Sequence, residues 1–179
     1  MAHRYFIIGA VFLLAAVSGS GAYGAGHIQY RLGSGDKIQV TVFGHKDLSG
    51  EFEVDGSGTI RLPLIGEVKV GRKTVQELET SIIGKLKPDY LLNPRVSVQV
   101  LNYRPFYIIG EVKKPGSYPY VSGMTVINAI ALAGGFTYRA RENQILVLRA
   151  NDLKRRKTAA DQNTPILPGD IIEVPERFF

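Results

Sequence analysis

Residues 107–136 read YIIGEVKKPGSYPYVSGMTVINAIALAGGF and combine an apolar strand, a turn and a short helix. We expect a strand over residues 108–112 and a second strand over residues 118–121. Between them, Pro115 presets φ and Gly116 tolerates a positive φ, so residues 114–117 predict a type II turn. The two strands and the turn therefore predict a small sheet.

The second half of this stretch predicts the helix that packs on the sheet. Thr125 is suited to cap its N-terminus, and Gly134 or Gly135 to end it in a left-handed conformation. One apolar face follows from the spacing of four residues, Val126, Ala129, Ile130 and Ala133. A strand pair followed by such a helix indicates an α+β unit.

Upstream, alternating apolar and polar residues predict strands over residues 37–43 and 95–101. Residues 55–58, Asp-Gly-Ser-Gly, predict a hairpin turn leading into a strand over residues 59–62. Thr74 and Glu77 predict a capping box for a helix that ends before Pro88. We interpret Glu79 on this helix as a solvated side chain rather than as half of a catalytic carboxylate pair.

Two short segments occur twice along the chain. The sequence of residues 65–68 returns at 109–112, and that of residues 35–40 is echoed at 169–174. We therefore expect two related strand–helix units with a boundary near Arg104. In the second unit, strands over residues 144–148 and 171–174 should pair across a loop over residues 149–169.

Residues 1–24 predict a secretory leader. Arg4 gives a basic start, residues 5–17 are apolar, and small residues follow, so we expect cleavage after Ala22 or Gly24. An uncleaved anchor is the alternative, although the apolar run is shorter than the roughly 20 residues of a membrane span. The chain has no cysteine, so we expect neither disulfides nor N-terminal lipidation.

No catalytic, cofactor-binding or metal-binding constellation is visible. The three histidines, His3, His27 and His45, are not at metal-ligand spacing. Residues 33–35, Gly-Ser-Gly, lack the lysine and the following helix of a phosphate-binding loop. We expect no cofactor and no enzymatic activity.

The formal net charge is +6, and it becomes +5 once Arg4 leaves with the leader. Much of the excess lies in one run: Lys154, Arg155, Arg156 and Lys157. The run is either a solvated loop tip or a contact surface for an acidic polymer or partner.

Tyrosines are the other candidates for contact, because their rings suit sugar C–H surfaces and their hydroxyls bond sugar oxygens. The candidates in the second half of the chain are Tyr118, Tyr120 and Tyr138. Strand propensity and core packing explain them equally well.

Several motifs resemble known domains. Ile109-Gly110-Glu111-Val112, Pro115-Gly116-Ser117-Tyr118, Ala133-Gly134-Gly135-Phe136 and residues 168–175 resemble the SLBB (soluble-ligand-binding β-grasp) domain. Residues 30–36 and 58–66 look like the polysaccharide biosynthesis/export domain. This order is that of bacterial polysaccharide export proteins of the outer-membrane polysaccharide export family, which includes Wza-type translocons, and the resemblance covers about residues 30–177.

The resemblance implies a fold and a domain plan. The fold is α+β, with an export domain built from a small mixed sheet and one helix, followed by a β-grasp-like SLBB domain. The plan is a signal peptide over residues 1–24, an export domain over 25–104 and an SLBB domain over 105–179.

The resemblance also implies a function. We expect a periplasmic component of an exopolysaccharide or capsule translocon, associated with the outer membrane, which forms a homo-oligomeric ring through which the exported polysaccharide passes. The implied partners are an inner-membrane polysaccharide copolymerase and, because we expect no pore-forming helix after Phe179, a separate outer-membrane pore protein. The leader argues against nucleic acid as a partner.

Two other interpretations stay open. One is a periplasmic module that binds a soluble ligand or a scaffold protein without conducting polymer. The other is a polysaccharide-modifying enzyme.

Overall fold

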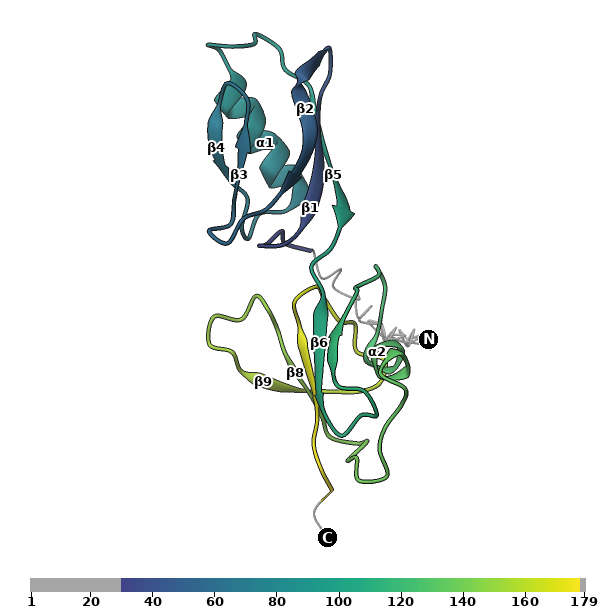
Figure 1. The fold of residues 1–179 in the computed structure, drawn as a ribbon. Helices are drawn as coiled ribbons and strands as arrows, with labels where there is room; N and C mark the ends of the chain where they lie inside the picture. Colours follow the sequence, from purple (N-terminus) through teal and green to yellow (C-terminus); the bar gives the residue numbers. More distant parts are fainter. Residues whose placement is uncertain (1–29, 178–179) are drawn as a thin grey trace, which may run out of the picture.

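Two hydrophobic cores organise residues 30–177, the part of the chain that the computed structural model describes (Figure 1). The first core is built from residues between Leu32 and Val98, and the second from residues between Phe106 and Val174. We call these the first unit and the second unit. Both mix strands with one helix, which confirms the α+β class. The leader expected over residues 1–24 lies outside the described residues.

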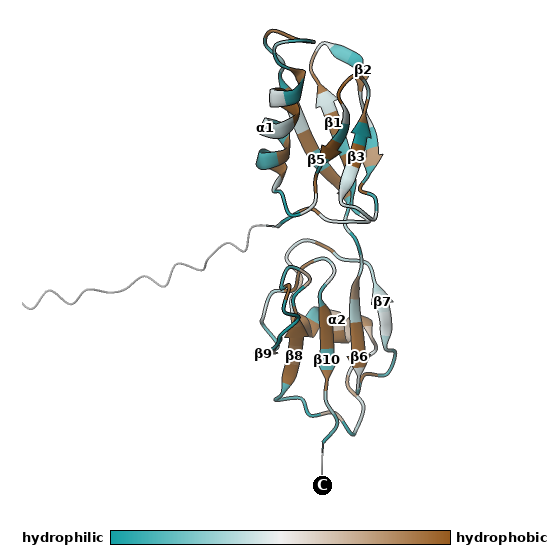
Figure 2. Cartoon of the chain, turned by 90° about the vertical axis from the view of Figure 1, so that its left-hand side faces the viewer, coloured by the Kyte–Doolittle hydropathy of each residue, from teal (hydrophilic) through white to brown (hydrophobic). Residues whose placement is uncertain are grey.

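The first unit contains an antiparallel sheet in the order β2-β1-β5, a separate hairpin β3–β4 and the helix α1. Its elements are β1 (Lys37–Val42), β2 (His45–Glu53), β3 (Thr59–Leu62), β4 (Gly66–Lys69), α1 (Val75–Leu86) and β5 (Val96–Asn102). Figure 2 shows α1 on one side of the unit and β1, β3 and β5 together on the other. Alternation along β1 places Ile38, Val40 and Val42 in the core, as the pattern predicts.

The helix α1 begins where the sequence predicts. The Thr74 side chain accepts a hydrogen bond from Glu77 N at 3.1 Å, and the Glu77 carboxylate accepts one from Thr74 N at 2.9 Å, so the capping box is confirmed. The buried face of the helix consists of Leu78, Ile82 and Leu86.

The interpretation of Glu79 as a solvated side chain is wrong. Its Oε1 atom accepts a hydrogen bond from the backbone N–H of Val98 at 2.8 Å, and the side chain is half-buried. Glu79 therefore fastens α1 to β5, a contact between elements that helix periodicity does not predict.

The second unit has a five-stranded sheet in the order β7-β6-β10-β8-β9, in which only β6 and β10 are parallel. Its elements are β6 (Phe106–Gly110), β7 (Gly116–Tyr118), α2 (Val126–Leu132), β8 (Ile145–Leu148), β9 (Lys157–Ala160) and β10 (Ile171–Val174). The pairing of β8 with β10 confirms the prediction for these strands. The helix α2 covers one face of the sheet, and Figure 2 shows the opposite face towards the viewer.

The turn predicted at residues 114–117 is wrong. Gly116 lies in β7 opposite Ile108, so the chain reverses between them, within residues 109–115. β6 ends at Gly110 rather than Val112 because Gly110 has a φ of 88°, and a Cβ there would lie 2.1 Å from the carbonyl oxygen of Val174. Val112 is instead buried and bridges to Phe136.

The hairpin predicted at residues 55–58 is also wrong, because β2 pairs with β1 whereas β3 pairs with β4. This turn connects two different sheets and is held by Asp55. Its carboxylate accepts hydrogen bonds from the Ser57 hydroxyl at 2.6 Å and from the backbone N–H groups of Ser57 and Thr59, each at 2.9 Å. These bonds, that from the Ser57 hydroxyl foremost, hold the pKa of Asp55 below its ordinary value.

The loop expected over residues 149–169 contains a strand. Residues 157–160 form β9, which pairs antiparallel with β8 and places Lys157 opposite Leu148. The basic run is therefore only partly a loop tip, since its last member starts an edge strand.

Candidate functional site: the cleft between the two units

Each unit has one buried carboxylate directly before its central strand. Asp36 directly precedes β1, Asp170 directly precedes β10, and both are 0% exposed. A buried carboxylate is stable only when it is paired and hydrogen-bonded. The neighbours of these two aspartates are therefore fixed parts of the fold.

The Asp36 carboxylate accepts hydrogen bonds from two parts of the chain. It accepts hydrogen bonds from Gly33 N at 2.7 Å, from Arg104 N at 3.0 Å and from Arg104 Nη1 at 3.1 Å. The first bond closes the turn before β1. The other two tie this turn to the segment that connects the units.

Asp170 is satisfied in a corresponding way. It accepts hydrogen bonds from Leu167 N at 2.9 Å, from Ala150 N at 3.0 Å and from Arg149 Nη1 at 2.7 Å. In both units the carboxylate bonds the amide three residues before it, an amide beyond the neighbouring antiparallel strand and an arginine. The sequence echo at residues 35–40 and 169–174 thus has a matching hydrogen-bond pattern.

Arg104 contacts both units. A Cβ on Gly33 would lie 2.3 Å from Arg104 Nη1, and a Cβ on Gly169 would lie 2.6 Å from Arg104 Nε. The next residue, Pro105, accepts a hydrogen bond from Gly169 N at 3.0 Å. The arginine side chain therefore lies between glycine backbones of the two units, where a larger residue would displace it.

Three tyrosine rings reinforce this junction. Tyr30 and Tyr103 meet edge to face with ring centroids 5.1 Å apart, and Tyr103 meets Tyr120 of the second unit in the same way at 5.3 Å. The Tyr30 hydroxyl donates a hydrogen bond to Asp36. Burial, together with this bond, raises the pKa of Tyr30 well above its ordinary value.

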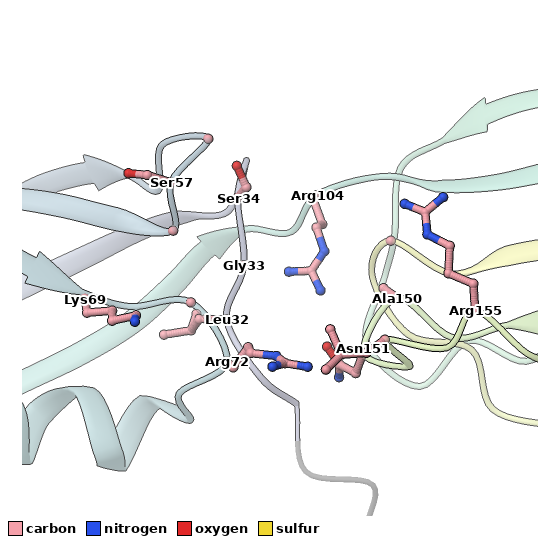
Figure 3. Close-up of a pocket in the computed structure, with 15 residues that line it drawn as sticks. Leu32, Gly33, Ser34, Ser57, Lys69, Arg72, Arg104, Ala150, Asn151 and Arg155 are labelled. Atoms are coloured by element: carbon pink, nitrogen blue, oxygen red, sulfur yellow. The ribbon is translucent and has the colours of Figure 1, made fainter.

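A cleft of about 520 Å³ lies next to this junction and receives residues from both units. Its cationic residues are Lys69, Arg72, Arg104 and Arg155, and no aspartate or glutamate lines it. Figure 3 shows Arg104 extending between the units and Arg72 pointing toward Asn151. The cleft therefore presents positive charge on both of its walls.

The structure separates the predicted basic run. Arg155 lines the cleft, whereas Lys154 is exposed outside it. Arg156 Nε pairs with Asp152 at 2.9 Å, and Lys157 Nζ pairs with Glu173 at 2.6 Å. Only one member of the run thus joins the cleft, and its partners there, Lys69, Arg72 and Arg104, were not predicted as site residues.

The predicted tyrosines do not form one surface. Tyr118 stacks on Phe106 with ring centroids 6.0 Å apart, and its hydroxyl donates a hydrogen bond to the Lys114 carbonyl. Tyr120 packs against Tyr103, and burial raises its pKa. Tyr138 is 86% exposed. A role of these tyrosines, or of the basic run, in polymer contact stays a prediction.

A second surface lies on the sheet of the second unit, on the side away from α2 (Figure 2). We call it the open face, and its apolar members are Tyr107, Ile109, Leu146, Leu148 and Ile171. Tyr107 is 44% exposed and Ile109 is 45% exposed. Alternation explains the open face, because the intervening residues point toward α2.

Within residues 30–177, no group of three or more histidine, cysteine, aspartate or glutamate side chains is arranged to hold a metal ion. No helix in that range is long and apolar enough to cross a membrane.

Comparison with known proteins connects the two units to known domains. Residues 26–101 match the polysaccharide biosynthesis/export protein family, and residues 105–157 match the SLBB domain. The matched regions follow each other in the order of the first and second units.

Three relatives show the same relationship. The chain is 38% identical over 135 residues to the exopolysaccharide production protein ExoF of Rhizobium meliloti (strain 1021), covering 69% of this chain and 32% of ExoF. It is 32% identical over 151 residues to the polysialic acid transport protein KpsD of Escherichia coli, covering 83% of this chain and 27% of KpsD. It is 29% identical over 140 residues to the EPS I polysaccharide export outer membrane protein EpsA of Ralstonia solanacearum, covering 64% of this chain and 37% of EpsA.

The chain thus spans about a third of the length of these curated relatives. The names of all three relatives refer to the production, transport or export of a polysaccharide. The first unit is thus a polysaccharide biosynthesis/export domain and the second an SLBB domain, in the tandem order of the two matches.

Proposed function

We propose that this protein is a periplasmic component of an exopolysaccharide or capsule export translocon and forms a ring through which the polymer passes toward the outer membrane. The tandem match to the export family and the SLBB domain carries the proposal. The names of the relatives, which concern exopolysaccharide production, polysialic acid transport and polysaccharide export, support the same process.

In this role the protein performs no covalent chemistry. A passage for a polymer needs weak polar contacts that repeat, because a tightly bound chain would stall. A symmetric ring supplies such repetition, since each lining residue occurs once in every subunit around the axis.

The open face supports assembly of a ring from copies of this chain. Tyr107 and Ile109 expose apolar surface there, and the carboxylate of Glu173 is already paired with Lys157 at 2.6 Å. Apolar surface with internally paired charge is suited to burial against a protein partner. We propose a second copy of the chain as its occupant, which in a ring contacts the open face with a different surface.

Two further partners complete the proposed translocon. An inner-membrane polysaccharide copolymerase would deliver polymer to the ring, and a separate outer-membrane pore protein would receive it. The name of EpsA as an outer membrane protein supports a place at the periplasmic side of that membrane.

Deletion of the gene tests the export role. We expect the deletion to abolish polymer at the cell surface while polymer precursor is still made, and a plasmid copy to restore export. Unchanged surface polymer in the deletion strain would contradict the proposal.

The alternative of a periplasmic binding module that conducts nothing is favoured by one observation, the cleft between the units. Light scattering with size-exclusion chromatography separates the two candidates. A monomer at all concentrations favours the binding module, whereas a single larger assembly favours the ring.

A further inference from the structure

Of the four cations that line the cleft between the units, only Arg104 forms an ion pair with a carboxylate of the described residues. Among the described residues, the ion pairs within 4.0 Å include Arg104 with Asp36 but involve none of Lys69, Arg72 and Arg155. These three exposed cations come from both walls of the cleft (Figure 3). Cations gathered around a concave surface attract anions more strongly than scattered ones do.

The backbone at two of these cations gives a second, independent indication. Only three non-glycine residues in the described part of the chain have a positive φ: Leu64 at 64°, Arg72 at 70° and Arg155 at 46°. The left-handed conformation is disfavoured for a residue with a Cβ. Two of these three residues, Arg72 and Arg155, therefore lie in the same cleft with a strained backbone. Backbone strain of this kind is concentrated at functional sites.

Backbone hydrogen bonds hold both strained arginines in turns, from Arg72 N to the Leu32 carbonyl at 2.8 Å and from Arg155 N to the Asp152 carbonyl at 2.9 Å, but they do not engage the guanidinium groups. The guanidinium groups of Arg72 and Arg155 make none of the side-chain ion pairs of the described residues, and both side chains are exposed. By contrast, Arg104 and Arg149 pair with Asp36 and Asp170. Arg72 and Arg155 are therefore available to a ligand.

The other residues of the cleft suit a hydroxyl-rich ring better than a bare anion. The Ser34 and Ser57 hydroxyls lie on its walls as hydrogen-bond acceptors, since each already donates a hydrogen bond to Asp55 at 2.6 Å, and the Asn151 amide lies on its walls as well. The Leu153 side chain, which also lines the cleft, is 80% exposed. Hydroxyl and amide groups exchange hydrogen bonds with sugar hydroxyls, and an apolar side chain packs on sugar C–H groups. The volume of about 520 Å³ lies within the range of about 300–1,000 Å³ that is usual for ligand pockets.

We infer that this cleft binds an acidic sugar residue of the exported polymer, with Arg72 and Arg155 contacting its carboxylate, sulfate or phosphate group. The inference rests on the proposed function and adds a substrate class, a polysaccharide with anionic substituents. Because the cations are exposed, each contact is screened by salt, so the polymer binds weakly and is released readily.

The test is a titration of the purified protein with tetragalacturonate and with neutral maltotetraose, followed by calorimetry and by amide chemical shifts. We expect tetragalacturonate to bind more tightly than maltotetraose and its affinity to fall as salt is raised. The double variant Arg72→Gln/Arg155→Gln should weaken binding about tenfold. The matched control Arg61→Gln/Lys46→Gln removes the same charge at exposed positions outside the cleft and should change affinity less than about twofold.

Three results would overturn the inference: equal binding of the two oligosaccharides, equal losses in the two double variants, or no binding of tetragalacturonate. A titration with inorganic sulfate is a further part of the experiment. If sulfate binds as tightly as tetragalacturonate and changes the same amide chemical shifts, the cleft binds simple anions and the assignment to a sugar is wrong.

The gene deletion separates this inference from the proposed function. Loss of surface polymer on deletion, combined with no binding of tetragalacturonate, leaves the export role standing and rejects the acidic-sugar site. Unchanged surface polymer rejects the export role whatever the purified protein binds.

Discussion

The carboxylates of Asp36 and Asp170 occupy corresponding positions in two different units. Each closes the turn before a central strand by accepting a hydrogen bond from the amide three residues earlier, at 2.7 Å for Asp36 and 2.9 Å for Asp170. Each also accepts a bond at 3.0 Å from an amide that follows the neighbouring strand. The difference lies in the arginine, because that of Asp36 is Arg104, which also contacts the second unit. The same arrangement of turn, carboxylate and arginine thus stabilises both units. In the first unit it also connects that unit to the second, through Arg104.

Replacing either aspartate should destabilise its own unit. We expect Asp36→Asn to lower the free energy of unfolding by about 3 kcal/mol, because Arg104 keeps its charge and loses the paired carboxylate. Amide hydrogen exchange should accelerate most in β1 for Asp36→Asn and most in β10 for Asp170→Asn. The exposed Asp47 offers a control, and Asp47→Asn should change stability by less than about 0.5 kcal/mol. Equal effects of Asp36→Asn and Asp47→Asn would contradict the structural role.

Because Arg104 contacts Gly169, a methyl group added at residue 169 should collide with the arginine. The cost of this collision can be measured separately from the cost of backbone strain. Gly169 and Gly123 have similar φ values, 83° and 85°, but a Cβ meets Arg104 Nε at 2.6 Å only at Gly169, and nothing within 4 Å at Gly123. We expect Gly123→Ala to lower the unfolding free energy by about 1 kcal/mol and Gly169→Ala by about 1–2 kcal/mol more.

A double-mutant cycle checks the origin of that difference. In an Arg104→Ala background the collision with the arginine is gone, so the effect of Gly169→Ala should shrink toward that of Gly123→Ala. Thermal or urea unfolding measures all four variants. An unchanged effect would mean that Arg104 is not the group that the new methyl meets.

Features that depend on a few neighbouring residues were predictable from the sequence. The capping box of Thr74 and Glu77 and the alternation along β1 use contacts within one helical turn or one strand, so the local pattern contains the whole interaction. The turns at Asp55 and Gly116 were predicted wrongly for the opposite reason. Which strands pair depends on contacts outside the turn: β2 pairs with β1 and β3 pairs with β4, so the turn at Asp55 joins two different sheets.

The cleft was beyond prediction from the sequence. Lys69 and Arg72 are close together in the sequence, but Arg104 and Arg155 are far from them, and only the packing of the two units brings all four together. The basic run also shows the limit of a charge pattern. Its four members look equivalent in sequence, but Arg156 and Lys157 pair with Asp152 and Glu173, and of the other two only Arg155 lines the cleft.

The open face predicts a variant that separates assembly from folding. Ile109→Glu places a charge on the open face, and we expect it to reduce the assembly to smaller species, because burying an unpaired carboxylate at an interface is unfavourable. Leu132→Glu on α2 is the matched control, since residue 132 is 49% exposed and residue 109 is 45% exposed. Light scattering measures the mass, and circular dichroism checks the fold. Loss of assembly in both variants, or in neither, would contradict a subunit contact at the open face.

The carboxylate of Asp55 predicts a pH dependence of stability in the first unit. Its pKa in the folded protein is lowered, foremost by the Ser57 hydroxyl, so its stabilising effect is present above its ordinary pKa. That effect is lost as the pH falls through the lowered value. Below about pH 4 the wild type should therefore lose stability more steeply than Asp55→Asn. Urea unfolding at several pH values measures the slopes, and parallel slopes would show that Asp55 does not contribute.

The strained backbone at Arg72 predicts a variant in which stability and binding change in opposite directions. Asparagine adopts the left-handed conformation more readily than arginine or glutamine, so Arg72→Asn should be more stable than Arg72→Gln by about 0.5–1 kcal/mol. Both changes remove the guanidinium, which makes no ion pair within the described residues, and both should weaken tetragalacturonate binding to the same extent. Thermal unfolding and calorimetry measure the two quantities on the same samples. If Arg72→Asn were less stable than the wild type, the φ of 70° would not be a source of strain, and the argument that Arg72 is kept there for binding would fail.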